Sequence, residues 1–101
     1  MRIAVLQGKK FTNHRMMFAK MDRLTIKLRT VIVLCRKEDK MSIKWANENM
    51  LQYMIYFQEE YERLAKDAEA VVIFGVDKET KWFADAVAIR EEVRVNYYEQ
   101  E

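Results

Sequence analysis

Strand-like and helix-like patterns alternate along this 101-residue chain, and this alternation restricts the fold more than any other feature. Short apolar runs rich in β-branched residues predict strands at residues 2–6, 30–35, 52–57, 70–74 and 93–97. Apolar residues at helical spacing predict helices over 13–28, after Asp39 or Ser42, over 58–68 and over 80–90. Because such alternation favours right-handed crossovers between parallel strands, we expect a three-layer α/β fold with a five-stranded parallel sheet.

Two strand orders are compatible with this alternation, and they place the second helix on different faces of the sheet. In the order 3-2-1-4-5, which we expect, the first two helices cover one face and the last two cover the other. In the order 2-1-3-4-5 the second helix would change sides. The run at 30–35 is apolar and β-branched, which is typical of a strand covered on both faces.

Composition indicates one ordinary globular domain over residues 1–101. The chain has no proline, and 50% of its residues are apolar and 34% are charged. A single cysteine, Cys35, excludes an internal disulfide, and a single histidine, His14, leaves no zinc-site spacing. We therefore expect neither a metal nor a cofactor. The apolar runs are strand-sized and the first begins at once, so we expect no membrane span, no signal peptide and a cytoplasmic location.

Charge is unevenly distributed between the two halves of the chain. Residues 1–50 carry twelve Lys and Arg against four Asp and Glu, whereas residues 51–101 carry six against twelve. In the expected strand order, the basic half supplies one helical layer and the acidic half supplies most of the other. The basic layer is a candidate surface for nucleic acid phosphates, although a solvated helix face is the simpler interpretation.

The only two glycines, Gly8 and Gly75, each follow a predicted strand. If strands 1 and 4 are parallel neighbours, these glycines flank the crevice in which open α/β sheets bind ligands. Lys9 and Lys10 stand beside that crevice, where they can either meet an anion or remain solvated. Thr80 can donate a hydrogen bond to a phosphate or cap the fourth helix.

Several short motifs occur here in a characteristic order. Arg2–Val5 is followed by Gly8–Asn13, Asp39 precedes Trp45–Ala46, and Ala68–Gly75 ends in a glycine. Together they resemble the SLOG superfamily of Rossmann-like proteins, and its YspA-like branch most closely, over nearly the whole chain. The resemblance implies a Rossmann-like fold and a site for a nucleotide-derived ligand.

The chain departs from that family at its phosphate-binding loops. The family has a glycine-rich loop after the second strand, whereas Leu34–Asp39 contains no glycine, and only Arg36 and Asp39 match. Glu38 would repel phosphate there, and Glu79 replaces the glycine before Thr80. The chain is therefore similar to a shortened, degenerate member. If a ligand is still bound, the resemblance implies the set Gly8, Lys9, Lys10, Arg36, Gly75 and Thr80.

Exposed aromatic residues are the candidates for partner binding. Trp82 and Phe83 are adjacent, so a helix cannot bury both on one face, and we expect Trp82 to contact a partner. The strand at 52–57 would be an edge in the expected order, and it lacks proline and charge. Tyr53 and Tyr56 are therefore predicted to lie at an edge that invites pairing with another chain.

No residue set in the sequence forms a catalytic centre, so the leading hypothesis is a non-enzymatic protein-binding module. Asp77 and Glu79 are interpreted as solvated loop charges rather than an acid/base pair. The short, Met- and Lys-rich chain resembles small phage-encoded proteins that inhibit or redirect a host factor. One alternative is a sensor or sponge for an ADP-ribose-like ligand. Weak nucleic-acid binding is a third function, and self-association through the edge strand is a further mode of interaction.

Overall fold

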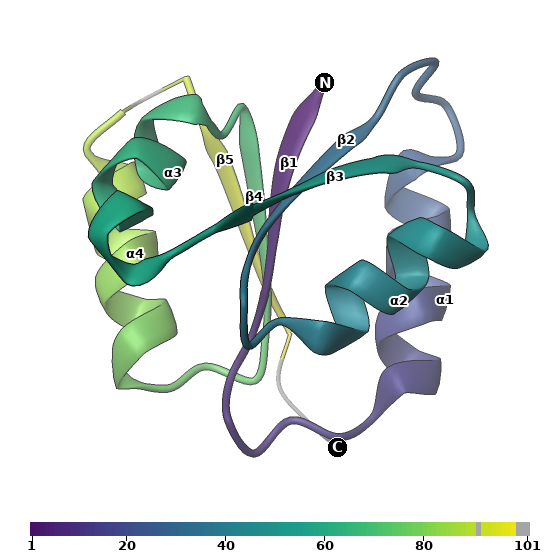
Figure 1. Ribbon diagram of the computed structural model, residues 1–101, viewed down its shortest axis with the longest axis horizontal. Coiled ribbons are helices and arrows are strands. Elements are labelled where there is room, and N and C mark those ends of the chain that lie inside the picture. The colour runs from purple at the N-terminus through teal and green to yellow at the C-terminus, as the bar shows by residue number, and fades with distance from the viewer. Residues whose placement is uncertain (91, 99–101) are drawn as a thin grey trace.

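Strands and helices alternate in the computed structural model, which describes residues 1–90 and 92–98 (Figure 1). The strands are β1 (Arg2–Gln7), β2 (Ile32–Arg36), β3 (Gln52–Tyr56), β4 (Ala70–Phe74) and β5 (Arg94–Tyr98). The helices are α1 (His14–Thr25), α2 (Lys40–Glu48), α3 (Tyr61–Asp67) and α4 (Lys78–Ala88), with a short 3-10 helix η1 (Gln58–Glu60) before α3. The described residues therefore contain every element that the sequence predicts.

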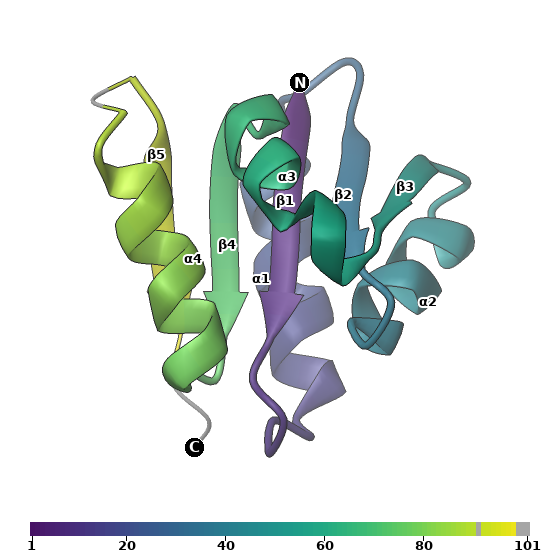
Figure 2. The same cartoon turned by 60° about the vertical axis from the view of Figure 1, so that its left-hand side comes forward.

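The strand order is β3-β2-β1-β4-β5 with every neighbouring pair parallel, which confirms the expected order. Figure 2 shows the strands side by side in this order. In Figure 1 the helices α1 and α2 lie on one side of the sheet, and α3 and α4 lie on the other. The layers follow from the right-handed crossovers, because the chain reverses its direction of travel across the sheet after β3.

Two apolar clusters fill the spaces between the sheet and its helical layers. On the α1–α2 side, the largest helical contributors are Met17, Met21 and Trp45. On the α3–α4 side they are Leu64, Phe83 and Val87. Successive residues of the central strands alternate between the two clusters, because strand side chains point alternately to opposite faces. The apolar runs of the sequence are thus accounted for by burial on both faces.

The first helix ends three residues earlier than its apolar pattern predicts. The Thr25 hydroxyl donates to the carbonyl of Met21 at 2.7 Å, and the Leu28 amide donates to the carbonyl of Thr25 at 3.0 Å. Leu28 still packs against the α1–α2 core from the loop, whereas Leu24 is exposed. A loop residue completes the apolar face here, so periodicity alone placed the helix end too late.

The charge of the two helical layers is only partly as the sequence predicts. Helices α1 and α2 together carry five basic and two acidic residues, so this layer is basic. Helices α3 and α4 carry four of each sign. The acidic excess of the second half lies instead in η1 and the loops, including Glu59, Glu60 and Asp77, while Glu91, Glu99 and Glu101 lie outside the described residues.

Among residues 1–90 and 92–98, none of the helices has the length and apolar character that crossing a bilayer requires.

Candidate binding site at the carboxyl ends of the strands

Gly8 and Gly75 lie side by side, as the sequence predicts, because β1 and β4 are parallel neighbours. The Gly8 amide donates to the carbonyl of Phe74 at 2.8 Å. A Cβ atom on Gly8 would stand 1.9 Å from the carbonyl oxygen of Gly75, and Gly75 has a φ of +74°. The two glycines are therefore required by the close approach of two loops, independently of any ligand.

Asp77 joins these two loops to the start of α4. Its carboxylate accepts from the backbone amide of Lys9 at 2.9 Å and from that of Thr80 at 2.9 Å. The Thr80 hydroxyl in turn accepts from the Asp77 amide at 2.8 Å, which completes a capping box. Asp77 is thus the N-cap, and Thr80 is a buried residue of the first turn. The predictions of a Thr80 cap and of a solvated Asp77 are wrong.

Removing the cap should have a pH-dependent effect on stability. Burial alone would raise the pKa of Asp77, but the amides of Thr80 and Lys9 hold it below 3.8. The ionised carboxylate therefore stabilises the fold above pH 3.8, and this contribution is lost as the pH falls through the lower folded-state pKa. Asp77→Ala should lower the free energy of unfolding by about 1 kcal/mol at pH 7, measured by urea denaturation.

The same comparison near pH 3 should show a smaller difference between the variant and the parent chain. Asp85→Ala, on the exposed face of the same helix, is the control and should change stability by less than about 0.5 kcal/mol. An equal loss at both pH values for Asp77→Ala would contradict the role of the ionised carboxylate.

Arg36 ends β2 and is buried, with 3% of its surface exposed. Its Nη2 donates to the carbonyl of Gln7 at 2.8 Å and to Asp39 Oδ1 at 2.9 Å, and its Nε donates to Asp39 Oδ2 at 3.0 Å. Although burial disfavours its charge, the hydrogen-bonded Asp39 raises the pKa of Arg36 above its ordinary value. The guanidinium is therefore a charged structural group beneath the site.

Asp39 precedes α2, but its carboxylate makes no cap hydrogen bond to that helix. It accepts instead from the backbone amides of Gln7 at 2.9 Å and Arg36 at 2.7 Å, in addition to the guanidinium. Burial raises the pKa of Asp39, against the lowering effect of these donors. The Arg36–Asp39 pair thus joins the ends of β1 and β2. Of the two predicted starts of the second helix, Asp39 is the N-cap residue by position, although its carboxylate makes no hydrogen bond to that helix.

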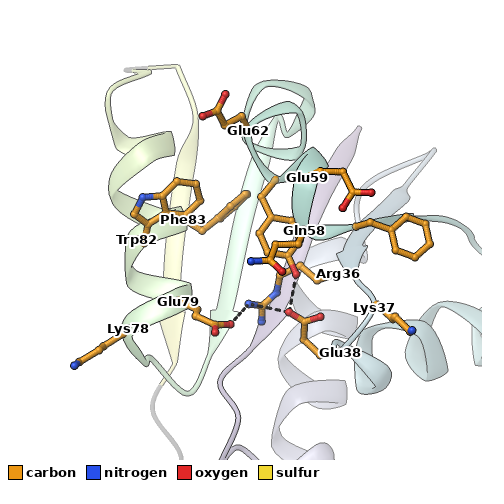
Figure 3. Close-up of a pocket in the computed structure, with 12 residues that line it drawn as sticks. Arg36, Lys37, Glu38, Gln58, Glu59, Glu62, Lys78, Glu79, Trp82 and Phe83 are labelled. Atoms are coloured by element: carbon orange, nitrogen blue, oxygen red, sulfur yellow. Dashed lines mark hydrogen bonds and ion pairs between the residues drawn. The ribbon is translucent and has the colours of Figure 1, made fainter.

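Two further carboxylates surround the outer face of Arg36. Its Nη1 lies 3.5 Å from Glu38 and 3.5 Å from Glu79, and Glu79 also lies 3.4 Å from Lys9 Nζ. Glu38 accepts from the Tyr61 hydroxyl at 2.8 Å, and burial and this hydrogen bond raise the pKa of Tyr61. Figure 3 shows Glu38 and Glu79 approaching the guanidinium from opposite sides. Three carboxylates thus surround one guanidinium.

Cavities open on either side of these ion pairs, and both are lined by Arg36, Glu38 and Glu79. The smaller, about 250 Å³, lies toward α2 and is also lined by Gly8 and Lys9. The larger, about 800 Å³, lies between the segment that follows β3 and the start of α4 (Figure 3). Its aromatic lining consists of Phe57, Tyr61, Trp82 and Phe83.

The residues predicted to hold a nucleotide do not form one phosphate cradle. The smaller cavity brings together Gly8, Lys9 and Arg36, whereas Lys10, Gly75 and Thr80 line neither cavity. The Lys9 amide is already bonded to Asp77, and Arg36 is already paired with carboxylates. The groups that would have to bind a phosphate are therefore already engaged by carboxylates of the chain itself.

The residues predicted to contact a partner separate into two classes. Tyr53 is exposed at the outer strand β3, and Trp82 is 51% exposed while its neighbour Phe83 is buried, as expected. Tyr56 is only 2% exposed, and its hydroxyl donates to Asp67 at 2.7 Å. Tyr56 is therefore not part of an exposed edge, because α3 covers it.

Sequence reasoning missed the residues that give the larger cavity its character. Phe57 and Tyr61 flank the 3-10 helix η1, and Glu59 lies within it. Their position directly after an edge strand, at the carboxyl end of the sheet, is the signal that could have identified them.

Cys35 and His14 show no sign of reactivity. The Cys35 thiol is buried 3.7 Å from the Met54 carbonyl, and burial raises its pKa to about 12. His14 packs edge-on against Phe18. Within residues 1–90 and 92–98, no cluster of His, Cys, Asp or Glu has the composition of a metal site.

Comparison of the chain with protein-family models, curated proteins and solved structures finds no match.

Proposed function

We propose that this protein is a non-enzymatic binding module that recognises another protein through its edge strand β3. The observation that carries the proposal is the exposure of an apolar, uncharged strand. Tyr53, Met54 and Ile55 each expose between 37% and 42% of their surface. Within the described residues β3 pairs with β2 alone, so one row of its backbone N–H and C=O groups is free to accept a further strand.

Apolar side chains are present on both faces of this edge. Tyr53 pairs in register with Val33, which belongs to the α1–α2 core, and Met54 pairs with Leu34, which belongs to the α3–α4 core. A strand added to β3 would therefore gain backbone hydrogen bonds and apolar contacts on both sides. No Lys or Pro, which commonly protect an edge from pairing, occurs in Gln52–Tyr56.

The opposite edge strand, β5, is less suited to adding a strand. It begins with Arg94, and Tyr98 at its other end stacks on Phe74 with ring centroids 5.2 Å apart. Lys20 Nζ also lies 5.4 Å from the centre of the Tyr98 ring. Arg94 thus places a charge at this edge, and the ring of Tyr98 is already held by its contacts. Strand β3 is therefore the favoured docking strand.

The other functions suggested by the sequence have less support. The carboxylates around Arg36 oppose a phosphate-bearing ligand. In the sequence, the basic residues of α1 and α2 are not accompanied by a set of aromatic residues on which nucleic acid bases could stack. A host factor as the partner, and the SLOG resemblance itself, stay predictions.

The test is site-specific photocrosslinking in a lysate of the organism that encodes the chain. A photoreactive phenylalanine at Tyr53 should capture a defined protein, because this position lies on the outer strand. Adding Ile55→Lys should reduce capture at least about tenfold, since a charge would be placed in the docked strand pair.

The matched control places the same photoreactive residue at Ile89, which is 83% exposed at the end of α4. In Figure 2 this helix lies beside β5, at the edge of the sheet opposite β3. It should not capture the same protein. Identical products from both positions, or no protein product from Tyr53, would contradict the proposal. A product of twice the mass of the chain would identify self-association at β3 instead.

A further inference from the structure

The larger cavity offers a second recognition element adjacent to β3. Phe57 follows β3 directly and lines the cavity, so a strand docked on β3 would end beside it. We infer that this cavity binds a cationic side chain, arginine or lysine, of a protein partner. This inference rests on the proposed function in one respect, which is that the cationic side chain belongs to a protein partner.

The charge of the cavity favours a cation. Arg36 is the basic group at its floor, and Asp39, Glu38 and Glu79 all approach it within 2.9–3.5 Å. Glu59 and Glu62 also line the cavity and make no ion pair within residues 1–90 and 92–98. In Figure 3 the side chains of these two glutamates and those of Lys37 and Lys78 all point away from Arg36, so the four charges lie at the rim of the cavity. At the floor of the cavity, three carboxylates against one guanidinium therefore leave an excess of negative charge.

The aromatic lining fits the apolar part of such a side chain. Phe57 is 50% exposed and Trp82 is 51% exposed. Large aromatic residues that are exposed together commonly mark a site of interaction with another molecule. The methylene stem of arginine or lysine packs well on aromatic rings, and its charged group is attracted to their faces. A volume of about 800 Å³ leaves room for one long side chain and part of its backbone.

The same cavity is unfavourable for an anionic ligand. Such a ligand would have to displace Glu38 or Glu79 from Arg36, and it would face Glu59 and Glu62 at the rim. Because Asp39 holds the guanidinium from below, Arg36 cannot turn outward to meet an anion without breaking buried hydrogen bonds. The cavity therefore distinguishes ligands by the sign of their charge.

The test uses three capped tripeptides, Leu-Arg-Leu, Leu-citrulline-Leu and Leu-Glu-Leu, titrated against the full chain. Tryptophan fluorescence reports binding, because Trp82 lies in the cavity and Trp45 is buried elsewhere. We expect the arginine peptide to bind with a Kd of about 1 mM or tighter. The citrulline and glutamate peptides should bind at least about tenfold more weakly, since they lack the positive charge.

Two variants test whether the arginine peptide binds in the larger cavity. Trp82→Phe should abolish the fluorescence change, because only the buried Trp45 remains. Glu59→Gln should weaken the arginine peptide about threefold, whereas the control Glu48→Gln on α2 should leave its affinity unchanged.

Equal affinity for the three peptides, tighter binding of the glutamate peptide, or no response to the arginine peptide would overturn the inference. These outcomes are separate from the photocrosslinking test of β3. Charge-selective peptide binding without a Tyr53 crosslink would support the cation-binding cavity and contradict partner recognition by β3. A Tyr53 crosslink without charge-selective peptide binding would support recognition by β3 and contradict the cation-binding cavity.

Discussion

Asp39→Ala should lower the free energy of unfolding by about 3–5 kcal/mol, because it leaves the Arg36 guanidinium buried without its closest carboxylate. The backbone amides of Gln7 and Arg36 would also lose their acceptor. This is a large part of the roughly 5–15 kcal/mol that stabilises a domain of this size. Urea denaturation followed by far-ultraviolet circular dichroism measures the loss.

A double-variant cycle shows whether the loss arises from the buried pair. Arg36→Met together with Asp39→Ala removes both charges, so the double variant should be more stable than the sum of the two single losses predicts. Lys37→Ala, at an exposed neighbouring position, is the control and should change stability by less than about 0.5 kcal/mol. Simple additivity of the two single effects would show that Arg36 and Asp39 do not act as a pair.

Gly8→Ala should lower the free energy of unfolding by about 3 kcal/mol. The added methyl group would stand 1.9 Å from the carbonyl oxygen of Gly75, which belongs to the backbone and cannot move aside as a side chain does. The loops after β1 and β4 would have to separate, and the hydrogen bond from the Gly8 amide to Phe74 would be strained. Thermal and urea denaturation measure the effect.

Lys10→Ala is the control in the same loop, because Lys10 is exposed and alanine removes atoms rather than adding them. It should change stability by less than about 0.5 kcal/mol. If Gly8→Ala had the stability of the parent chain, the loops after β1 and β4 would have to lie farther apart than the structure describes. Unchanged stability is the result expected for a glycine that is needed only for the approach of a ligand.

Much of the fold could be predicted because its signals are local. The apolar run that contains β2 and the helical spacing of Met17 and Met21 each identify an element without knowledge of its neighbours. The crossover rule then restricted the sheet to two orders, and burial of the first, second and fourth strands agrees with the one expected. The end of α1 was misplaced because Leu28 reaches the same core from a loop.

The candidate site was predicted less completely because its contacts are distant in sequence. The adjacency of Gly8 and Gly75 followed from strand order, but their mutual contact depends on how two loops pack. Arg36 and Asp39 were placed in a ligand loop, whereas burial makes them a structural pair. Tyr53 and Tyr56 were both assigned to the edge, and the position of α3 decided that only Tyr53 is exposed.

The sequence by itself determined the elements, their parallel arrangement and the apolar character of the edge strand, because periodicity and composition act over a few neighbouring residues. Only the tertiary structure decided the electrostatics of the site. Glu38 and Glu79 are far apart in the chain, yet both lie 3.5 Å from Arg36. Since charge interactions depend on distance in space and on burial, the surrounding of Arg36 by three carboxylates became visible only in the folded chain.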